Sequence, residues 1–288
     1  MYLATNVPGE PHLRIKPDSD LTKFKPEYLN YSVRLVWSDY SDKFINDFIE
    51  VFKDLKYLDI ANYTGNVSNS FIFQFPKLEG LAISLFHDSD FILDCSKLPK
   101  SLYSLNLNVW SKKHIINIEA LNDTNLEMLY VADFDEKDLI KLSGLTNLKG
   151  LSVARSKIKS LEGIENLINI EHLSFGGVRS LTDIASILAL KKVERLEFDI
   201  CWKLKDFSPI GELKALKELQ LLDCKNLESI KFVKDLPNLK RLSTLGTTII
   251  NDYDTTPAEH VPVFFGSLNN KYNKQYPEKE IKKSLSEL

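Results

Sequence analysis

The chain has 288 residues, and its 37 basic and 40 acidic side chains give a formal net charge of −3. This near balance argues against a polyanion-binding function, because neutralising many phosphates needs an excess of Lys and Arg. Hydrophobic residues make up 43% of the chain and charged residues 27%, an ordinary globular mix that excludes disorder of the whole chain.

Cysteine usage and hydropathy indicate a soluble protein of a reducing compartment. Cys95, Cys201 and Cys224 are too scattered for a disulfide framework or a zinc site, and no C-x-x-C occurs. The first ten residues have neither the basic nor the apolar region of a secretory signal. No apolar run approaches the roughly 18 residues that a membrane-spanning helix needs. We therefore expect a cytoplasmic location and no membrane partner.

The N-terminal segment, residues 1–54, differs in composition from the rest of the chain. Four prolines before residue 30 predict an extended, irregular entry. Between Ser41 and Phe52, apolar residues at helical spacing predict a helix that Ser41 or Asp42 caps and that covers the first strand. Val33 and Leu35 resemble a degenerate copy of the repeat that begins at residue 55.

Residues 55–247 contain nine copies of the pattern L-x-x-L-x-L, in which other aliphatics and Phe also occur. The first positions succeed one another at steps of 22 to 24 residues. The copies are Leu55-Leu58-Ile60, Leu78-Leu81-Ile83, Leu102-Leu105-Leu107, Leu126-Leu129-Val131, Leu148-Leu151-Val153, Ile170-Leu173-Phe175, Val193-Leu196-Phe198, Leu216-Leu219-Leu221 and Leu239-Leu242-Thr244. A repeat of this length predicts a solenoid in which stacked units bury one continuous core.

Each unit combines a strand with a tight return. The alternation in Leu58-Asp59-Ile60 is strand periodicity, with apolar side chains inward and the intervening ones outward. In the later copies the strand is followed by three-residue apolar steps, as in Ile158-Leu161-Ile164-Leu167, which suit short 3₁₀ segments. Parallel strands on one side and bulkier returns on the other predict a curved array.

After Thr247 the repeat stops, and residues 248–288 are expected to form a C-terminal cap and tail. An apolar patch at Val261, Val263, Phe264 and Phe265 lies among prolines. The Lys- and Glu-rich end is expected to form a short helix or to fray.

These copies resemble the leucine-rich-repeat family, and the later ones resemble its short class of internalins and SDS22-type regulators. The resemblance implies an α/β repeat solenoid, a right-handed superhelix with a concave parallel β-sheet and short 3₁₀ or helical convex returns. It specifies the fold and hardly the function.

The chain departs from the family in the turn column, where family repeats carry Asn. The column here contains no Asn and reads Tyr63, Phe86, Trp110, Phe134, Ser156, Val178, Cys201, Cys224 and Thr247. The aromatic half predicts an apolar stack, and the second half resembles the cysteine-bearing repeat subclass. Cys201 and Cys224 are expected to be buried ladder thiols rather than a redox or metal pair.

The sequence carries no sign of an enzyme. The five histidines have no metal-ligand spacing and lie beside no nucleophile motif, and no phosphate-binding glycine loop occurs. We therefore expect no catalytic residue, no cofactor and no metal.

The residues that alternate with the buried positions predict a binding face on the concave sheet. Small residues near Gly150 and Ser174 adjoin a cluster of mixed charge, and a solvated face with no partner is the alternative. The candidate partner-binding residues are Tyr57, Asp59, Tyr130, Arg155, His172, Arg195, Glu197, Asp199, Glu218, Asp223 and Arg241. Arg195 and Arg241 are the strongest candidates, because Arg pairs carboxylates bidentately and is enriched in binding hot spots.

We therefore expect a monomeric, non-catalytic module that binds a protein partner on its concave face and binds no nucleic acid. A bacterial immunity or inhibitor protein that neutralises a toxin or enzyme is the leading hypothesis. A scaffold, an adaptor or a host-directed effector that recognises peptide or several protein partners is the alternative.

Overall fold

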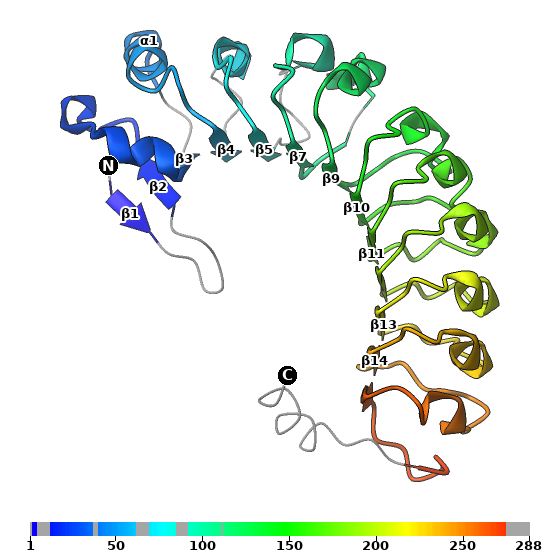
Figure 1. The fold of residues 1–288 in the computed structure, drawn as a ribbon. Helices are drawn as coiled ribbons and strands as arrows, with labels where there is room; N and C mark the ends of the chain where they lie inside the picture. Colours follow the sequence, from blue (N-terminus) through cyan, green and yellow to red (C-terminus); the bar gives the residue numbers. More distant parts are fainter. Residues whose placement is uncertain are drawn as a thin grey trace. The chain divides into compact units, whose positions relative to one another are not determined.

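The computed structural model divides the chain into unit 1, Met1–Ala132, and unit 2, Asp133–Leu288. It describes residues 2–4, 12–36, 40–61, 69–84, 92–110 and 112–274. In both units short strands alternate with short helical returns, as the repeat predicts. Figure 1 shows the strands of unit 2 along one edge of the unit and the returns along the opposite edge.

Unit 1 contains a sheet with the strand order β1-β2-β3-β4-β5-β7-β9, in which β1 is antiparallel to β2 and the other pairs are parallel. A second, two-stranded sheet pairs β6 with β8. The strands are β1 Tyr2–Ala4, β2 His12–Ile15, β3 Ser32–Val36, β4 Tyr57–Ala61, β5 Gly80–Ser84, β6 Leu93–Asp94, β7 Ser104–Leu107, β8 Ile115–Ile116 and β9 Met128–Ala132. The returns are η1 Leu21–Lys23, η2 Pro26–Asn30, α1 Asp42–Val51, η3 Asn69–Gln74, η4 Cys95–Lys97 and η5 Ile118–Asp123, where η marks a 3₁₀ helix.

Unit 2 contains parallel strands in the order β10-β11-β12-β13-β14-β15. The strands are β10 Gly150–Ala154, β11 His172–Gly176, β12 Arg195–Asp199, β13 Glu218–Leu222, β14 Arg241–Thr244 and β15 Val263–Gly266. The returns are η6 Ile140–Leu142, η7 Ile164–Asn166, η8 Ala185–Ala189, η9 Ser208–Glu212, η10 Lys231–Asp235 and η11 Thr256–Ala258. This architecture confirms the predicted α/β repeat solenoid.

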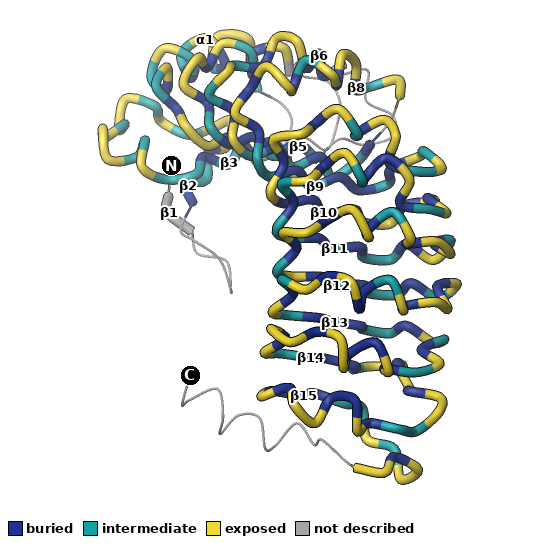
Figure 2. The backbone as a smooth tube through the Cα atoms, turned by 45° about the vertical axis from the view of Figure 1, so that its right-hand side comes forward, coloured by how far each residue is buried: buried dark blue, intermediate teal, exposed yellow. Residues whose placement is uncertain are grey.

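The repeat positions form the part of the core beneath the strands, and apolar residues of the returns complete it. All the predicted L-x-x-L-x-L side chains of the nine copies are buried, and none is more than 3% exposed. Equivalent residues stack across strands, so that the Phe175 and Phe198 rings lie parallel with their centroids 5.4 Å apart. Burying one such aliphatic or aromatic side chain contributes roughly 1.5–3 kcal/mol, and the repeat adds this contribution at each rung. Figure 2 shows buried and half-buried residues along these strands, with exposed residues at the turns.

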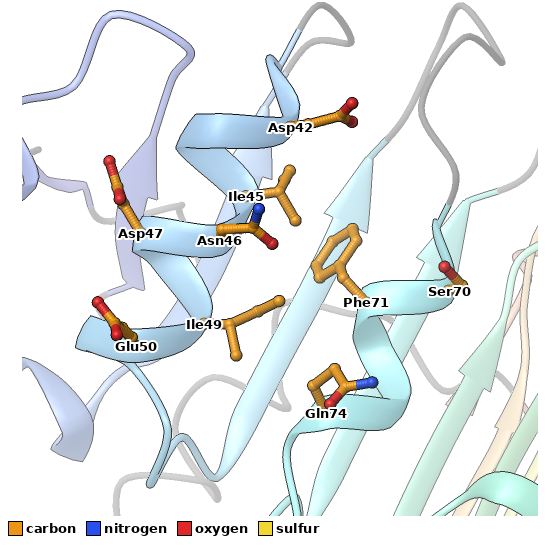
Figure 3. A pocket seen from close by; sticks show the side chains of 9 residues that line it. All are labelled: Asp42, Ile45, Asn46, Asp47, Ile49, Glu50, Ser70, Phe71 and Gln74. Atoms are coloured by element: carbon orange, nitrogen blue, oxygen red, sulfur yellow. The ribbon is translucent and has the colours of Figure 1, made fainter.

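The predicted helix forms, and it lies between returns rather than at the end of the sheet. Ser41 caps α1 by accepting a hydrogen bond from the Phe44 N–H at 3.2 Å. The helix contacts η1 on one side and η3 on the other. In Figure 3, Ile45 and Ile49 point from α1 toward Phe71 of η3, across a hollow of about 860 Å³. The helix is therefore an internal return of unit 1.

Both flanking segments contribute strands that the sequence pattern did not predict. The N-terminal segment, expected to be extended and irregular, contains β2, which pairs with β3 in the register Leu13 to Val33. The C-terminal apolar patch forms β15, which pairs with β14 in the register Leu242 to Phe264. The division of the chain at residues 54 and 247 stays a prediction.

The turn column is buried where the structure describes it, with one correction. Trp110 and Phe134 are buried, while Tyr63 and Phe86 lie outside the described residues. In the last copy the column position belongs to Thr248 rather than Thr247, because Thr248 is buried and its hydroxyl donates to the Leu221 carbonyl at 2.9 Å. The turn of this copy is one residue longer than the repeat spacing predicts.

Candidate functional site

The strand register of unit 2 brings most of the predicted binding residues onto one face. Parallel pairing aligns His172 with Arg195, Arg195 with Glu218, and Glu218 with Arg241. The next outward column aligns Ser174 with Glu197, and the one after it aligns Gly176 with Asp199. We name this outward surface of β10–β14 the strand face.

Glu218 occupies the centre of the strand face, between the two arginines that the sequence favours. Its carboxylate lies 3.6 Å from the Arg195 Nε and 3.1 Å from an Arg241 guanidinium nitrogen. Arg241 also lies over the Phe265 ring, 4.9 Å from its centroid. Both arginines are therefore already engaged within the chain. A partner carboxylate would have to compete with Glu218 for them.

Glu197 and Asp199 have the opposite character, because their charges are poorly compensated. Burial, then the charges of Asp199 and Glu218, raise the pKa of Glu197. Burial, then the charge of Asp223, raise the pKa of Asp199. Within the described part of the chain neither carboxylate makes a salt bridge. The face thus holds negative charge at a cost in folding free energy, and a cation placed against it would relieve that cost.

The remaining candidates of unit 2 lie where strands end or begin. Arg155, directly after β10, forms two hydrogen bonds to the Asp133 carboxylate, at 3.1 and 3.2 Å. Asp223, directly after β13, accepts the Thr247 N–H at 2.7 Å. Gly246 leaves room for that carboxylate, because a Cβ atom there would lie 2.3 Å from an Asp223 oxygen. His172, at the start of β11, is half-buried beside Arg195.

Three predicted residues belong to unit 1. Tyr57 of β4 is 40% exposed, and its hydroxyl donates to Glu79 at 3.0 Å while its ring lies over Gly80. Asp59 of β4 pairs with Arg34 at 2.7 Å, and burial raises its pKa despite that neighbour. Tyr130 lies on β9, separated from β4 by β5 and β7. The structure therefore brings together the unit 2 candidates and does not cluster the three of unit 1.

A basic hollow at the carboxyl ends of β10–β12 was not predicted from the sequence. Lys157, Arg179 and Lys203 line it beside Arg155, with a volume of about 630 Å³. Part of the signal was present in the sequence. Two residues after Arg155, Gly177, Ile200 and Asp223, which directly follow the strands β10 to β13, the chain carries Lys157, Arg179, Trp202 and Lys225. The search for outward-facing strand residues did not include these turn positions.

Neutralising the two poorly compensated carboxylates is expected to stabilise the fold. Glu197→Gln with Asp199→Asn should raise the free energy of unfolding at pH 7, because the folded state no longer holds charges that burial and repulsion disfavour. At pH values above the raised pKa values of Glu197 and Asp199, both groups are charged in the folded protein and the gain in unfolding free energy is complete. As the pH falls through these pKa values toward the ordinary values of 4.5 and 3.8, both groups become protonated and the gain disappears. Urea unfolding of variant and wild type across pH measures the difference.

The exposed return-side change Glu212→Gln is the control for that measurement, and it should leave the free energy of unfolding unchanged. A double variant that is less stable than wild type at pH 7 would show that the two carboxylates are compensated.

The cysteines are buried and unpaired, as the sequence predicts for ladder thiols. The Cys201 and Cys224 sulfurs lie 3.5 and 3.4 Å from the carbonyl oxygens of Phe175 and Phe198. The hydrogen bond with Cys224, together with burial, raises the pKa of the Cys201 thiol. Burial raises the pKa of Cys95 to about 12. Among the described residues, no three Cys, His, Asp or Glu side chains gather at a place suited to a metal ion.

Because burial keeps the reagent from all three sulfurs and raises the pKa of the Cys95 and Cys201 thiols, native protein should resist iodoacetamide at all three cysteines and be alkylated once unfolded in guanidinium. Mass spectrometry of the alkylated peptides measures this. Rapid modification of Cys201 and Cys224 in the native protein would contradict their burial.

Comparisons with solved structures support the fold. An internalin, inlF, from Listeria monocytogenes is 22% identical, with a TM-score of 0.58 over 86% of this chain and 78% of that one. The internalin C2 of the same species is 19% identical, with a TM-score of 0.51 over 70% of this chain and 84% of that one. The Toll–Spatzle complex of Drosophila matches at 11% identity and a TM-score of 0.64, over 90% of this chain and 37% of that one.

No protein-family model and no curated protein matches the sequence. Within the described residues, no helix has the length and apolarity to span a bilayer.

Proposed function

We propose that this chain, which has the leucine-rich-repeat fold, is a non-catalytic module that binds one folded protein partner on the strand face of unit 2. The observation that carries the proposal is the poorly compensated pair Glu197 and Asp199, which lie on adjacent outward columns of the sheet near other carboxylates and form no salt bridge among the described residues. Carboxyl groups whose pKa is raised by burial and by neighbouring carboxylates are typical of functional surfaces.

The chemistry of the face specifies what the partner must present. A Lys or Arg of the partner, placed against Glu197 and Asp199, would replace repulsion by attraction in a half-buried setting. The Arg195–Glu218–Arg241 ladder lies beside this position and holds its charges in a fixed order. Fixed charges on strands restrict binding to a complementary surface, which favours a single partner over many peptides.

Two further features are consistent with the module. The fold also occurs in a structure described as the Toll–Spatzle complex. Three cysteines without a disulfide fit a reducing compartment, so we propose a cytoplasmic location. We further propose that the protein is a monomer. We propose the role of an inhibitor, such as a bacterial immunity protein against a toxin or enzyme, because a face of fixed, ordered charges suits one complementary partner. If the protein were a scaffold or an effector, affinity capture would instead recover several protein partners.

The test is affinity capture from the cells that make the protein, with three full-length baits. Wild type and the control Glu162→Lys with Glu212→Lys, on exposed return-side residues, should recover the same protein in near-stoichiometric amount. Glu197→Lys with Asp199→Lys carries the same change in net charge and should lose it. Equal recovery on all three baits would overturn the strand face as the binding surface.

A further inference from the structure

The basic hollow at the carboxyl ends of β10–β12 is a second charged surface beside the strand face. Its lining includes Arg155, Lys157, Gly177, Arg179, Ile200 and Lys203. We name it the basic groove. Four of its lining side chains are cations, and among the residues that the structure describes no carboxylate lines it.

The repeat creates the groove. Each strand from β10 to β13 is followed directly by a residue of left-handed backbone: Arg155, Gly177, Ile200 and Asp223 have φ of 50°, 68°, 54° and 50°. The residues two positions after these turns are Lys157, Arg179, Trp202 and Lys225. Lys157 and Arg179 therefore follow neighbouring parallel strands, whose backbones lie ~4.8 Å apart. Ile200 is a β-branched residue in a conformation that costs of order 1–3 kcal/mol, and it places an apolar side chain in the groove.

Most of the charge in the groove is uncompensated. Arg155 is held by Asp133. Lys157 and Lys203 form no salt bridge within the described ranges. Arg179 and Lys225 lie on Trp202, each 4.3 Å from the centre of its indole ring. Two cations therefore lie against the Trp202 ring next to the groove. Trp and Arg are among the residue types most enriched in binding hot spots.

We propose that the basic groove binds an acidic, carboxylate-bearing segment of the protein partner. The inference rests on the proposed function for the nature of the ligand and adds a second contact point to it. The partner would then present a cation to Glu197 and Asp199 and an anionic segment to the groove. Such a polarised arrangement fixes the orientation of the partner on the face.

A nucleic acid fits the groove less well. Asp199 ends β12 and Asp223 follows β13, so both lie at strand ends next to the groove, and they would repel a continuous phosphate chain. The net charge of −3 adds to this repulsion. A short segment with a few carboxylates can occupy the groove without crossing those residues.

The experiment titrates a capped tetraglutamate peptide into the full-length protein and follows tryptophan fluorescence. Wild type should show a saturable change that raised salt weakens, because the contact is electrostatic. Lys157→Glu with Lys203→Glu should weaken the peptide at least tenfold. The control Lys141→Glu with Lys231→Glu carries the same change in net charge on exposed return residues and should bind like wild type.

Absence of a saturable change, or equal loss in both double variants, would overturn the inference. Tighter binding of a short oligothymidylate through Lys157 and Lys203 would overturn it in favour of a nucleic acid. The proposed function would survive both of these outcomes if capture of the partner still required Glu197 and Asp199. If the protein bound the peptide but captured no partner, the proposed function alone would be contradicted.

Discussion

Replacing Phe48 by Asp is expected to unfold the region around α1 and to make the protein insoluble. The Phe48 ring is fully buried and packs against Phe52, Phe71 and Phe75, with centroids 4.8, 6.3 and 5.7 Å away. Truncating a buried Phe costs about 3–5 kcal/mol, and an unpaired buried carboxylate costs more. Whole domains are stable by only about 5–15 kcal/mol.

Thermal melting by circular dichroism and the soluble fraction on expression measure this effect. The control is Asn46→Asp, which adds the same charge at an exposed position of α1 and should melt like wild type. A cooperative melt of Phe48→Asp within a few degrees of wild type would show that α1 does not support unit 1.

Charge reversal on the strand face is expected to cause the second large effect. Glu197→Lys with Asp199→Lys should weaken binding of the captured partner by two or more orders of magnitude. Truncating one member of a buried charge pair at an interface costs about 2–5 kcal/mol, and repulsion adds to that cost. The variant relieves carboxylate repulsion within the chain, so its melting temperature should not fall. Loss of affinity therefore reports on the interface and not on folding.

Isothermal titration calorimetry of the captured partner measures the affinity, with Glu162→Lys plus Glu212→Lys as the control of equal charge. Arg195 and Arg241 are a poorer choice for reversal. Each contacts Glu218, so their replacement by Glu would place like charges opposite one another and destabilise the sheet. A control that weakens binding as much as the face variant would place the interface elsewhere.

The sequence predicted the strands well because a period-two pattern leaves little freedom. A one-residue shift would turn Leu196 and Phe198 outward, so the hydrophobic pattern alone sets the register. It failed at the C-terminal end for a physical reason. Strand β15 pairs Phe264 with Leu242, yet the leucines that identify the repeat are replaced there by Val and Phe. In the last turn an extra residue moves the column from Thr247 to Thr248.

The candidate site was predictable only in part. Register decides which side chains face outward, so the column Arg195, Glu218 and Arg241 follows from spacing. Which of them pair with one another depends on side-chain conformation, and that is why Arg195 and Arg241 looked available in the sequence. The basic groove depends on left-handed turns such as that at Ile200, a backbone state that a β-branched residue does not suggest.

Carbodiimide labelling of carboxylates tests the central claim most directly. Mass spectrometry of the free protein quantifies the labelling of four carboxylates: Glu197 and Asp199 of the strand face, and Glu162 and Glu212 of the returns. With the captured partner bound, labelling of Glu197 and Asp199 should fall strongly, while labelling of Glu162 and Glu212 should stay constant. Protection of the return carboxylates with unchanged labelling of Glu197 and Asp199 would contradict binding on the strand face.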